Sequence, residues 1–247
     1  MPEAMPVEQA FLATCAMAQI PHGVEAAALS ASIRERSRQL WQKNPVHDYC
    51  VSIGVSSWEG LSSEFEGDGS EIAVLREWVA GYRKSSWELA LGDHGVGDEN
   101  LVKKLSDSFK QEKYQRYVTY PETHDALRLL QHSYPLAMLT NGIADVQNAK
   151  IDAGELRSYF TTVVISSEVG IGKPSVKPFE FTLERLGVSR DEAVMVGNSL
   201  SRDVGGAQAA GIYSVWMNRD GSKLEGGLSP DAQIKLLSDL PEVLTPL

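Results

Sequence analysis

The chain has 247 residues, which is enough for one large domain or two smaller ones. Its 33 acidic and 23 basic residues give a net charge of −10, and this argues against a general binder of nucleic acid or of an acidic membrane surface, since both need a basic face. Cys15 and Cys50 form no metal or disulfide pattern, no apolar run approaches the roughly 18 residues of a membrane span, and no signal-peptide pattern is present, so we expect a cytoplasmic protein.

Residues 1–118 are predicted to form a helical domain. Apolar residues recur there at helical spacing in four segments, which cover residues 6–18, 24–43, 71–82 and 98–117. Turn-forming residues separate these segments, as in Ser62–Ser70, and no convincing strand is evident.

Residues 119–247 are predicted to form an α/β domain, because short apolar strands alternate with helices there. The expected strands cover residues 136–140, 163–166, 193–197, 213–217 and, less distinctly, 232–236. This alternation predicts a Rossmann-like parallel sheet with helices on both faces. Right-handed crossovers then place the strand ends Thr140, Ser166 and Gly197 along one edge.

The first polar motif, Thr140-Asn141-Gly142, directly follows the first expected strand. A hydroxyl and backbone N–H groups at a strand end can hold a phosphate oxygen. The alternative is a turn that only begins the next helix, and for the motif taken alone this alternative is favoured.

The second motif, Gly172-Lys173-Pro174-Ser175, opens the helix after the second strand. A lysine at a helix N-terminus is unfavourable to the helix dipole, unless an anion is shared between the two. A solvated surface lysine is an equally weighted alternative.

The third motif is the segment Ala193–Gly211, in which a buried strand, a tight turn and a helix of small residues follow one another. Asn198 and Asp203 on the turn offer the oxygen ligands that Mg²⁺ prefers. The alternative is that Asp203 only caps the helix, which leaves the run of small residues unexplained.

Together the three motifs resemble the haloacid dehalogenase-like hydrolase superfamily, in its phosphatase branch with an inserted helical cap. The resemblance rests on LAMLTNG, GIGKPSVKPFEF and VGNSLSRDVGGAQAAG, which occur in the family's order. It implies Mg²⁺-dependent hydrolysis of a small phosphomonoester, such as a sugar phosphate or a nucleotide, through an aspartyl-phosphate. It also implies catalytic roles for Thr140 and Lys173, phosphate contacts from Thr140, Asn141, Gly142 and Lys173, and metal contacts from Asn198 and Asp203.

The helical first half corresponds to the cap in this resemblance. Four of its residues would then be candidates to line the closed site: Trp58, Arg83, Lys84 and Trp87. For each of them, a place in the core or on the surface of the cap is the favoured alternative. The implied partner is a small phosphorylated metabolite.

Two departures from the family pattern leave alternatives open. Asn198 stands where the family has an aspartate, which removes one charge from the metal site and slightly favours the metal-independent 2-haloacid dehalogenases. The 247 residues also contain no DxD, the motif that carries the family's nucleophile. We therefore expect a truncated or misassigned start, with a non-catalytic binding protein as the alternative.

The nucleophile strand of the family lies between the strands expected at 136–140 and 193–197. We therefore expect a gap one strand wide between these two, either empty, filled by a displaced N-terminal segment, or closed by direct pairing.

Overall fold

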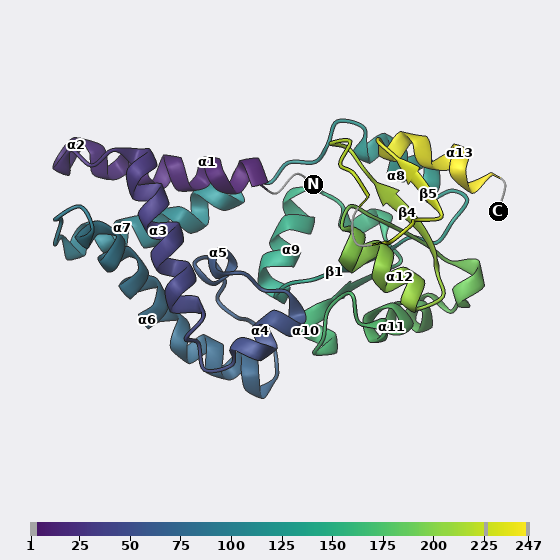
Figure 1. Ribbon diagram of the computed structural model, residues 1–247, viewed down its shortest axis with the longest axis horizontal. Helices are drawn as coiled ribbons and strands as arrows, with labels where there is room; N and C mark the ends of the chain where they lie inside the picture. The colour runs from purple at the N-terminus through teal and green to yellow at the C-terminus, as the bar shows by residue number, and fades with distance from the viewer. Residues whose placement is uncertain (1–3, 225–226, 246–247) are drawn as a thin grey trace. The chain divides into compact units, whose positions relative to one another are not determined.

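A computed structural model describes residues 4–224 and 227–245 of the chain (Figure 1). It divides into two compact units. The first, here called the helical unit, consists of Met1–Thr119 and Ile143–Gly154, and the second, the sheet unit, consists of Tyr120–Gly142 and Glu155–Leu247. Among the described residues, no helix is both long and apolar enough to cross a membrane.

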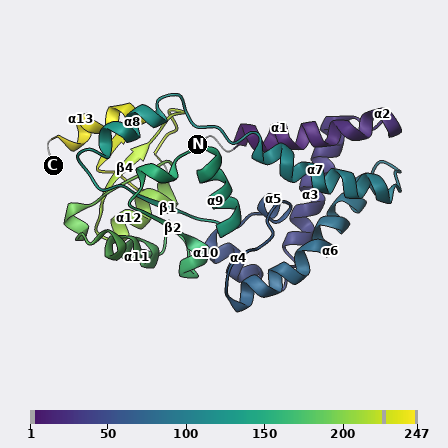
Figure 2. The same ribbon diagram turned by 180° about the vertical axis from the view of Figure 1, so that it is seen from behind.

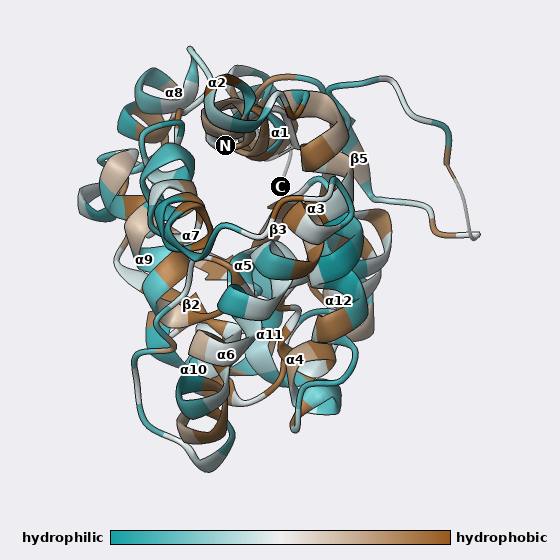
Figure 3. Cartoon of the chain, turned by 90° about the vertical axis from the view of Figure 1, so that its left-hand side faces the viewer, coloured by the Kyte–Doolittle hydropathy of each residue, from teal (hydrophilic) through white to brown (hydrophobic). Residues whose placement is uncertain are grey.

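The helical unit contains the four expected helices, shorter helices that the sequence did not indicate, and α9, a helix from the segment expected in the α/β domain. Its elements are α1 (Ala4–Cys15), η1 (Ala16–Ala18), α2 (Gln19–His22), α3 (Ala26–Trp41), α4 (His47–Ile53), α5 (Ser57–Gly60), α6 (Ser70–Gly92), α7 (Glu99–Tyr114) and α9 (Ala144–Ala153). Asp98 begins α7 by accepting a hydrogen bond from the amide of Leu101 at 3.0 Å, as N-cap residues do. In Figure 3, α7 carries hydrophilic and hydrophobic residues along one ribbon, as an amphipathic helix does.

Helix α6 continues ten residues beyond its expected end at residue 82, because the polar residues 83–86 do not end it. Its apolar face continues beyond them through Trp87 and Leu91, both fully buried. Helix α6 packs along α3, where Trp41 lies edge-on to Trp78, and α1 packs on α7, where the rings of Phe11 and Phe109 stack at 4.4 Å. These aromatic contacts form the core of the helical unit.

Helix α9 also belongs to this core, although the sequence placed it with the α/β domain. The side chains of Ile143, just before α9, and Val146 are fully buried in the same apolar cluster as Phe11 and Trp87. The spacing of apolar residues reveals that a helix has a buried face, but it does not reveal which neighbour covers that face.

The sheet unit contains the five expected strands. They are β1 (Ala137–Thr140), β2 (Thr162–Ile165), β3 (Val194–Gly197), β4 (Tyr213–Met217) and β5 (Ala232–Ile234). Its helices are α8 (Thr123–Leu130), η2 (Arg157–Tyr159), α10 (Ser166–Val169), α11 (Val176–Leu186), η3 (Arg190–Glu192), η4 (Leu200–Val204), α12 (Gly205–Ala209), η5 (Leu237–Asp239) and α13 (Leu240–Leu244). All strand pairs are parallel, as the alternation of strands and helices predicts.

The strands form two sheets, one of β1 and β2, which lie side by side in Figure 2, and one in the order β3-β4-β5. Within the described part of the chain, β1 and β3 do not pair with each other. Of the expected possibilities, direct pairing of these two strands is therefore wrong. Every residue of β1 and β3 is only half-buried, whereas the three central residues of β4 are buried. An inner strand of a parallel sheet is normally covered on both faces and both edges. Among the described residues, β1 and β3 each have a strand partner at one edge only.

The run of small residues after β3 allows close helix packing. A Cβ atom on Gly206 would lie 2.6 Å from the Phe179 ring and 3.1 Å from the Cα of Pro174. Since Phe179 is on α11, a glycine at this position is what brings α12 against α11.

Candidate active site

Lys173 connects the two sheets of the sheet unit. Its Nζ donates a hydrogen bond to the carbonyl oxygen of Leu139 on β1 at 2.7 Å, and it forms an ion pair with Oδ1 of Asp203, after β3, also at 2.7 Å. The two side chains are only 9% and 8% exposed. A buried charge needs a partner of this kind, so the alternative of a solvated surface lysine is wrong.

Asn141 holds the backbone that carries Lys173. Its Oδ1 accepts from the amide of Lys173 and its Nδ2 donates to the carbonyl of the same residue, both at 2.8 Å. Gly172 makes room for this contact, because a Cβ atom there would lie 2.7 Å from the Asn141 carboxamide. The side chain of Asn141 is thus engaged in orienting Lys173.

Asp203 lies on the turn η4, directly against the end of β3. Its Oδ2 accepts from the amide of Ser199 at 2.9 Å, and a Cβ atom on Gly197 would lie 2.3 Å from its carboxyl carbon. Ser199, not Asp203, is the residue at the N-cap of η4, where it accepts from the amide of Arg202 at 3.2 Å. The carboxylate of Asp203 therefore contacts the amide of the N-cap residue through Oδ2 and Lys173 through Oδ1, so it does more than cap this helix.

Thr140 and Gly142 lie at the carboxyl end of β1, where Ser166 contacts the same turn. The amide of Gly142 donates to Ser166 Oγ at 2.8 Å, and Thr140 Oγ1 donates to the carbonyl of Asn141 at 3.4 Å. Gly142 has a φ of +135°, a conformation that favours glycine. From the sequence, Ser166 is expected only as the end of a strand. Its position as a polar residue directly after the apolar residues of β2 is the pattern that could have identified it as a site residue.

Asn198 lies on the same turn as Asp203, and its carbonyl oxygen accepts from Trp216 Nε1 at 3.0 Å. Both carboxylate oxygens of Asp203 already have partners, one of them the cationic Lys173. Among the described residues, no group of three or more His, Cys, Asp and Glu side chains could hold a metal ion. Since Mg²⁺ takes six oxygen ligands and favours anionic ones, Asn198 and Asp203 alone do not fit it.

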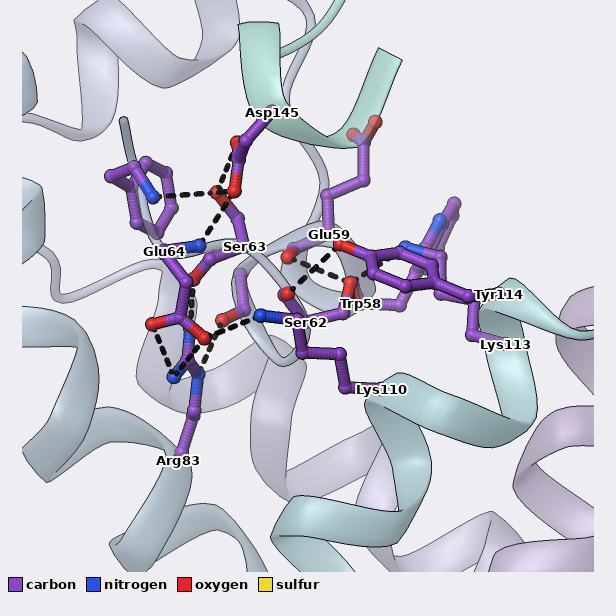
Figure 4. Close-up of polar contacts among 12 residues, drawn as sticks. Trp58, Glu59, Ser62, Ser63, Glu64, Arg83, Lys110, Lys113, Tyr114 and Asp145 are labelled. Atoms are coloured by element: carbon purple, nitrogen blue, oxygen red, sulfur yellow. Dashed lines mark hydrogen bonds and ion pairs between the residues drawn. The ribbon is translucent and has the colours of Figure 1, made fainter. Parts of the chain in front are cut away.

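The four candidates in the helical unit have separate roles, and Figure 4 shows two of them, Trp58 and Arg83. Trp87 is fully buried beside Phe109 in the core, and Lys84 pairs with Glu88 on the surface. Arg83 donates to the carbonyls of Gly60 and Ser63 and pairs with Glu64 at 3.2 Å. The side chain of Trp58 is about one-third exposed at 37%.

Comparison with known proteins gives consistent matches. The family model described as "Haloacid dehalogenase-like hydrolase" matches residues 79–217. The chain is 34% identical to a phosphoserine phosphatase of Thermus thermophilus over 86% of this chain and 83% of that protein. It is 29% identical to the human N-acylneuraminate-9-phosphatase over 67% of this chain and 68% of that protein. Among solved structures, it is similar to a 2-haloacid dehalogenase from Pseudomonas syringae pv. Tomato, with a TM-score of 0.63, 26% identity, and coverage of 98% of this chain and 92% of that one.

Proposed function

Since the chain belongs to the haloacid dehalogenase-like hydrolase family, we propose that its sheet unit binds and orients the phosphoryl group of a small phosphomonoester for hydrolysis. The observation that carries this proposal is the buried pair of Lys173 and Asp203, held at 2.7 Å beside the carboxyl end of β1. A cation held rigidly at such an edge stabilises the negative charge that develops on a transferring phosphoryl group.

The residues of this site have different proposed roles. Lys173 supplies the positive charge, Asp203 and Asn141 orient it, and Thr140 brings a hydroxyl to the end of β1. Each of these groups is in place before any ligand arrives, so the site is preorganised. The two relatives named above are phosphatases, which supports a phosphomonoester over a haloacid as the substrate.

The proposed reaction class is attack of an aspartate carboxylate on phosphorus, which breaks the bond to the substrate's alkoxide and releases it as the protonated alcohol. Water then attacks the phosphorus of the aspartyl-phosphate, which frees the carboxylate and releases inorganic phosphate. The family's aspartate lies in a DxD, and the 247 residues contain none. We therefore propose that the site residues named above bind the phosphoryl group. Turnover requires in addition a nucleophile from outside the 247 residues. Magnesium dependence stays a prediction, and no step is assigned to the ion here, because Asn198 and Asp203 do not fit it unaided.

A binding and turnover experiment tests the proposal. We expect isothermal titration to detect inorganic phosphate binding to the chain, loss of that binding in Lys173→Met, and unchanged binding in Lys177→Met, an exposed lysine four residues away. p-Nitrophenyl phosphate with Mg²⁺ should give no turnover. Absence of phosphate binding to the unaltered chain would contradict the proposal.

Metal-independent dehalogenation is the second candidate, and the misfit of Mg²⁺ at Asn198 and Asp203 favours it. The similarity to the 2-haloacid dehalogenase structure supports it as well. Dehalogenation displaces the halide with a nucleophile, so it also requires one from outside these 247 residues. Chloride release from 2-chloropropionate with that nucleophile supplied, unchanged by a chelator, would establish this candidate and end the phosphatase proposal. If the phosphatase proposal is right, Asn198→Asp raises Mg²⁺ affinity, since the added carboxylate supplies a charged ligand.

A further inference from the structure

A network of polar side chains fixes the start of α9 to the segment Ser62–Phe65 within the helical unit (Figure 4). Ser63 Oγ lies 2.8 Å and 3.0 Å from the two carboxylate oxygens of Asp145, and the amide of Glu64 donates to Asp145 Oδ2 at 2.7 Å. Two residues further along α9, Gln147 Nε2 donates to the buried carboxylate of Glu59 on α5 at 3.0 Å. Two carboxylates thus join α9 to α5 and to the segment that follows it.

The segment that Asp145 holds is itself fixed from several sides. Lys113 Nζ donates to Ser62 Oγ at 2.8 Å, both residues being fully buried, while Arg83 holds the carbonyl of Ser63. Phe65 is buried with a φ of +53°, a left-handed conformation that is uncommon for a bulky residue. Such a conformation persists only where the surroundings determine it, so the segment is a rigid support for α9.

The boundary between the two units falls at the peptide bond between Gly142 and Ile143. On one side, Gly142 is fixed in the sheet unit by Ser166 Oγ and by the amide of Ser167, which donates to its carbonyl at 3.3 Å. On the other side, the side chain of Ile143 is fully buried in the core of the helical unit. The segment Thr140–Gly142 is therefore one peptide bond away from a residue that is fixed in the other unit.

We propose that Asp145 is a positioning residue, which fixes α9 to Ser62–Phe65 and thereby constrains the segment Thr140–Gly142. This inference rests on the proposed function, since it assigns the constraint to the segment that would contact the phosphoryl group. Without Asp145, Ser63 Oγ and the amide of Glu64 lose an ionised acceptor, and the first turn of α9 is released. The backbone of Thr140–Gly142 then samples more conformations, and phosphate binding has to restrict them again.

A simpler role would be that Asp145, in the first turn of α9, only favours the positive end of the helix dipole. The two roles differ in how far the effect of a substitution extends. Loss of a dipole contact would loosen residues 143–148 alone, whereas loss of a positioning contact also loosens Thr140–Gly142 in the sheet unit.

Amide hydrogen exchange separates these roles. In Asp145→Ala we expect exchange at Thr140–Gly142 to rise about threefold or more, while strand β4 remains as in the unaltered chain. Ser63→Ala, which removes one of the contacts to Asp145, should shift the same amides in the same direction by less. The matched control is Asp107→Ala on α7, an exposed aspartate paired with Lys103, and it should change none of these amides.

Titration with inorganic phosphate provides the second readout. We expect its Kd to rise in Asp145→Ala by about the factor seen in exchange, and to recover partly in Asp145→Asn, which retains one acceptor oxygen. Unchanged exchange at Thr140–Gly142 in both Asp145→Ala and Ser63→Ala, with faster exchange at 143–148, would overturn the inference. If the unaltered chain binds no phosphate, the proposed function fails, and the exchange comparison still decides whether α9 constrains this segment.

Discussion

Replacing Lys173 by methionine should destabilise the sheet unit as well as abolish phosphate binding. The substitution removes the ion pair with Asp203 and the hydrogen bond to the carbonyl of Leu139, both at 2.7 Å. Asp203 is then left buried at 8% exposure with a single hydrogen bond, from the amide of Ser199. An uncompensated buried charge costs about 3 kcal/mol or more of unfolding free energy.

A double-mutant cycle isolates the contribution of the pair. Asp203→Asn in the background of Lys173→Met removes the orphaned charge and retains an acceptor for Ser199. We therefore expect the double variant to be more stable than Lys173→Met alone, with a coupling energy of about 2 kcal/mol. Urea denaturation followed by circular dichroism measures all four free energies of unfolding, provided that each variant gives one cooperative transition.

The result that would refute this reasoning is additivity. If the two substitutions destabilise the chain by independent amounts, Lys173 and Asp203 do not stabilise each other, and the cation is not preorganised by its partner. Lys177→Met is the control here as well, because its exposed side chain should leave the free energy of unfolding within about 0.5 kcal/mol.

Two further predictions concern the helical unit. Burial raises the pKa of Cys15 and of Cys50 from 9.0 to about 12, so the thiolate population of each falls roughly a thousandfold. We expect iodoacetamide to modify neither cysteine in the folded chain but both in urea, as measured by mass spectrometry. Modification of the folded chain at neutral pH would contradict their burial. For Glu64, burial acts to raise the pKa, but Lys110 and Arg83 outweigh it and the pKa lies below its ordinary value. The stabilisation from ionised Glu64 is therefore present above its unfolded pKa and is lost as the pH falls through the lower, folded pKa. In Glu64→Gln, the free energy of unfolding should therefore fall less steeply as the pH is lowered into the acid range. An unchanged acid dependence would show that this carboxylate contributes nothing to stability.

The elements of the sheet unit could be predicted from the sequence because each has a local signal. The strand Tyr213–Met217 occurs where its apolar run predicts it, and β1 and β3 each differ from the expected bounds by one residue at one end. In the helical unit, the local pattern does not predict the full length of α6, since the polar residues 83–86 lie inside this helix. There the tertiary contacts of Trp87 and Leu91 override the local pattern.

The contacts of α9 could not be predicted in this way. Ser63 and Asp145 are 82 residues apart, and no spacing rule relates them. The same holds for Lys113, a residue that composition would place on the surface and that the structure buries beside Ser62. Amphipathic patterns identify buried faces, whereas pairing between elements depends on shape and charge that only the folded chain brings together.

The division of the five strands into two sheets gives Lys173 a structural importance that its motif alone does not suggest. In a continuous sheet, ladder hydrogen bonds would join the strand that ends at Thr140 to its neighbours on both sides. In the part of the chain that the structure describes, β1 pairs only with β2 and β3 only with β4. The contacts between the two sheets include the packing of α11 on β1, β2 and α12, and the lysine that touches Leu139 and Asp203 at once.

Because one side chain both holds the sheets together and supplies the charge for phosphate, loss of phosphate binding in Lys173→Met cannot by itself be assigned to the lost charge. The double variant with Asp203→Asn resolves this, since a chain that regains stability without regaining phosphate binding assigns the binding to the charge of Lys173.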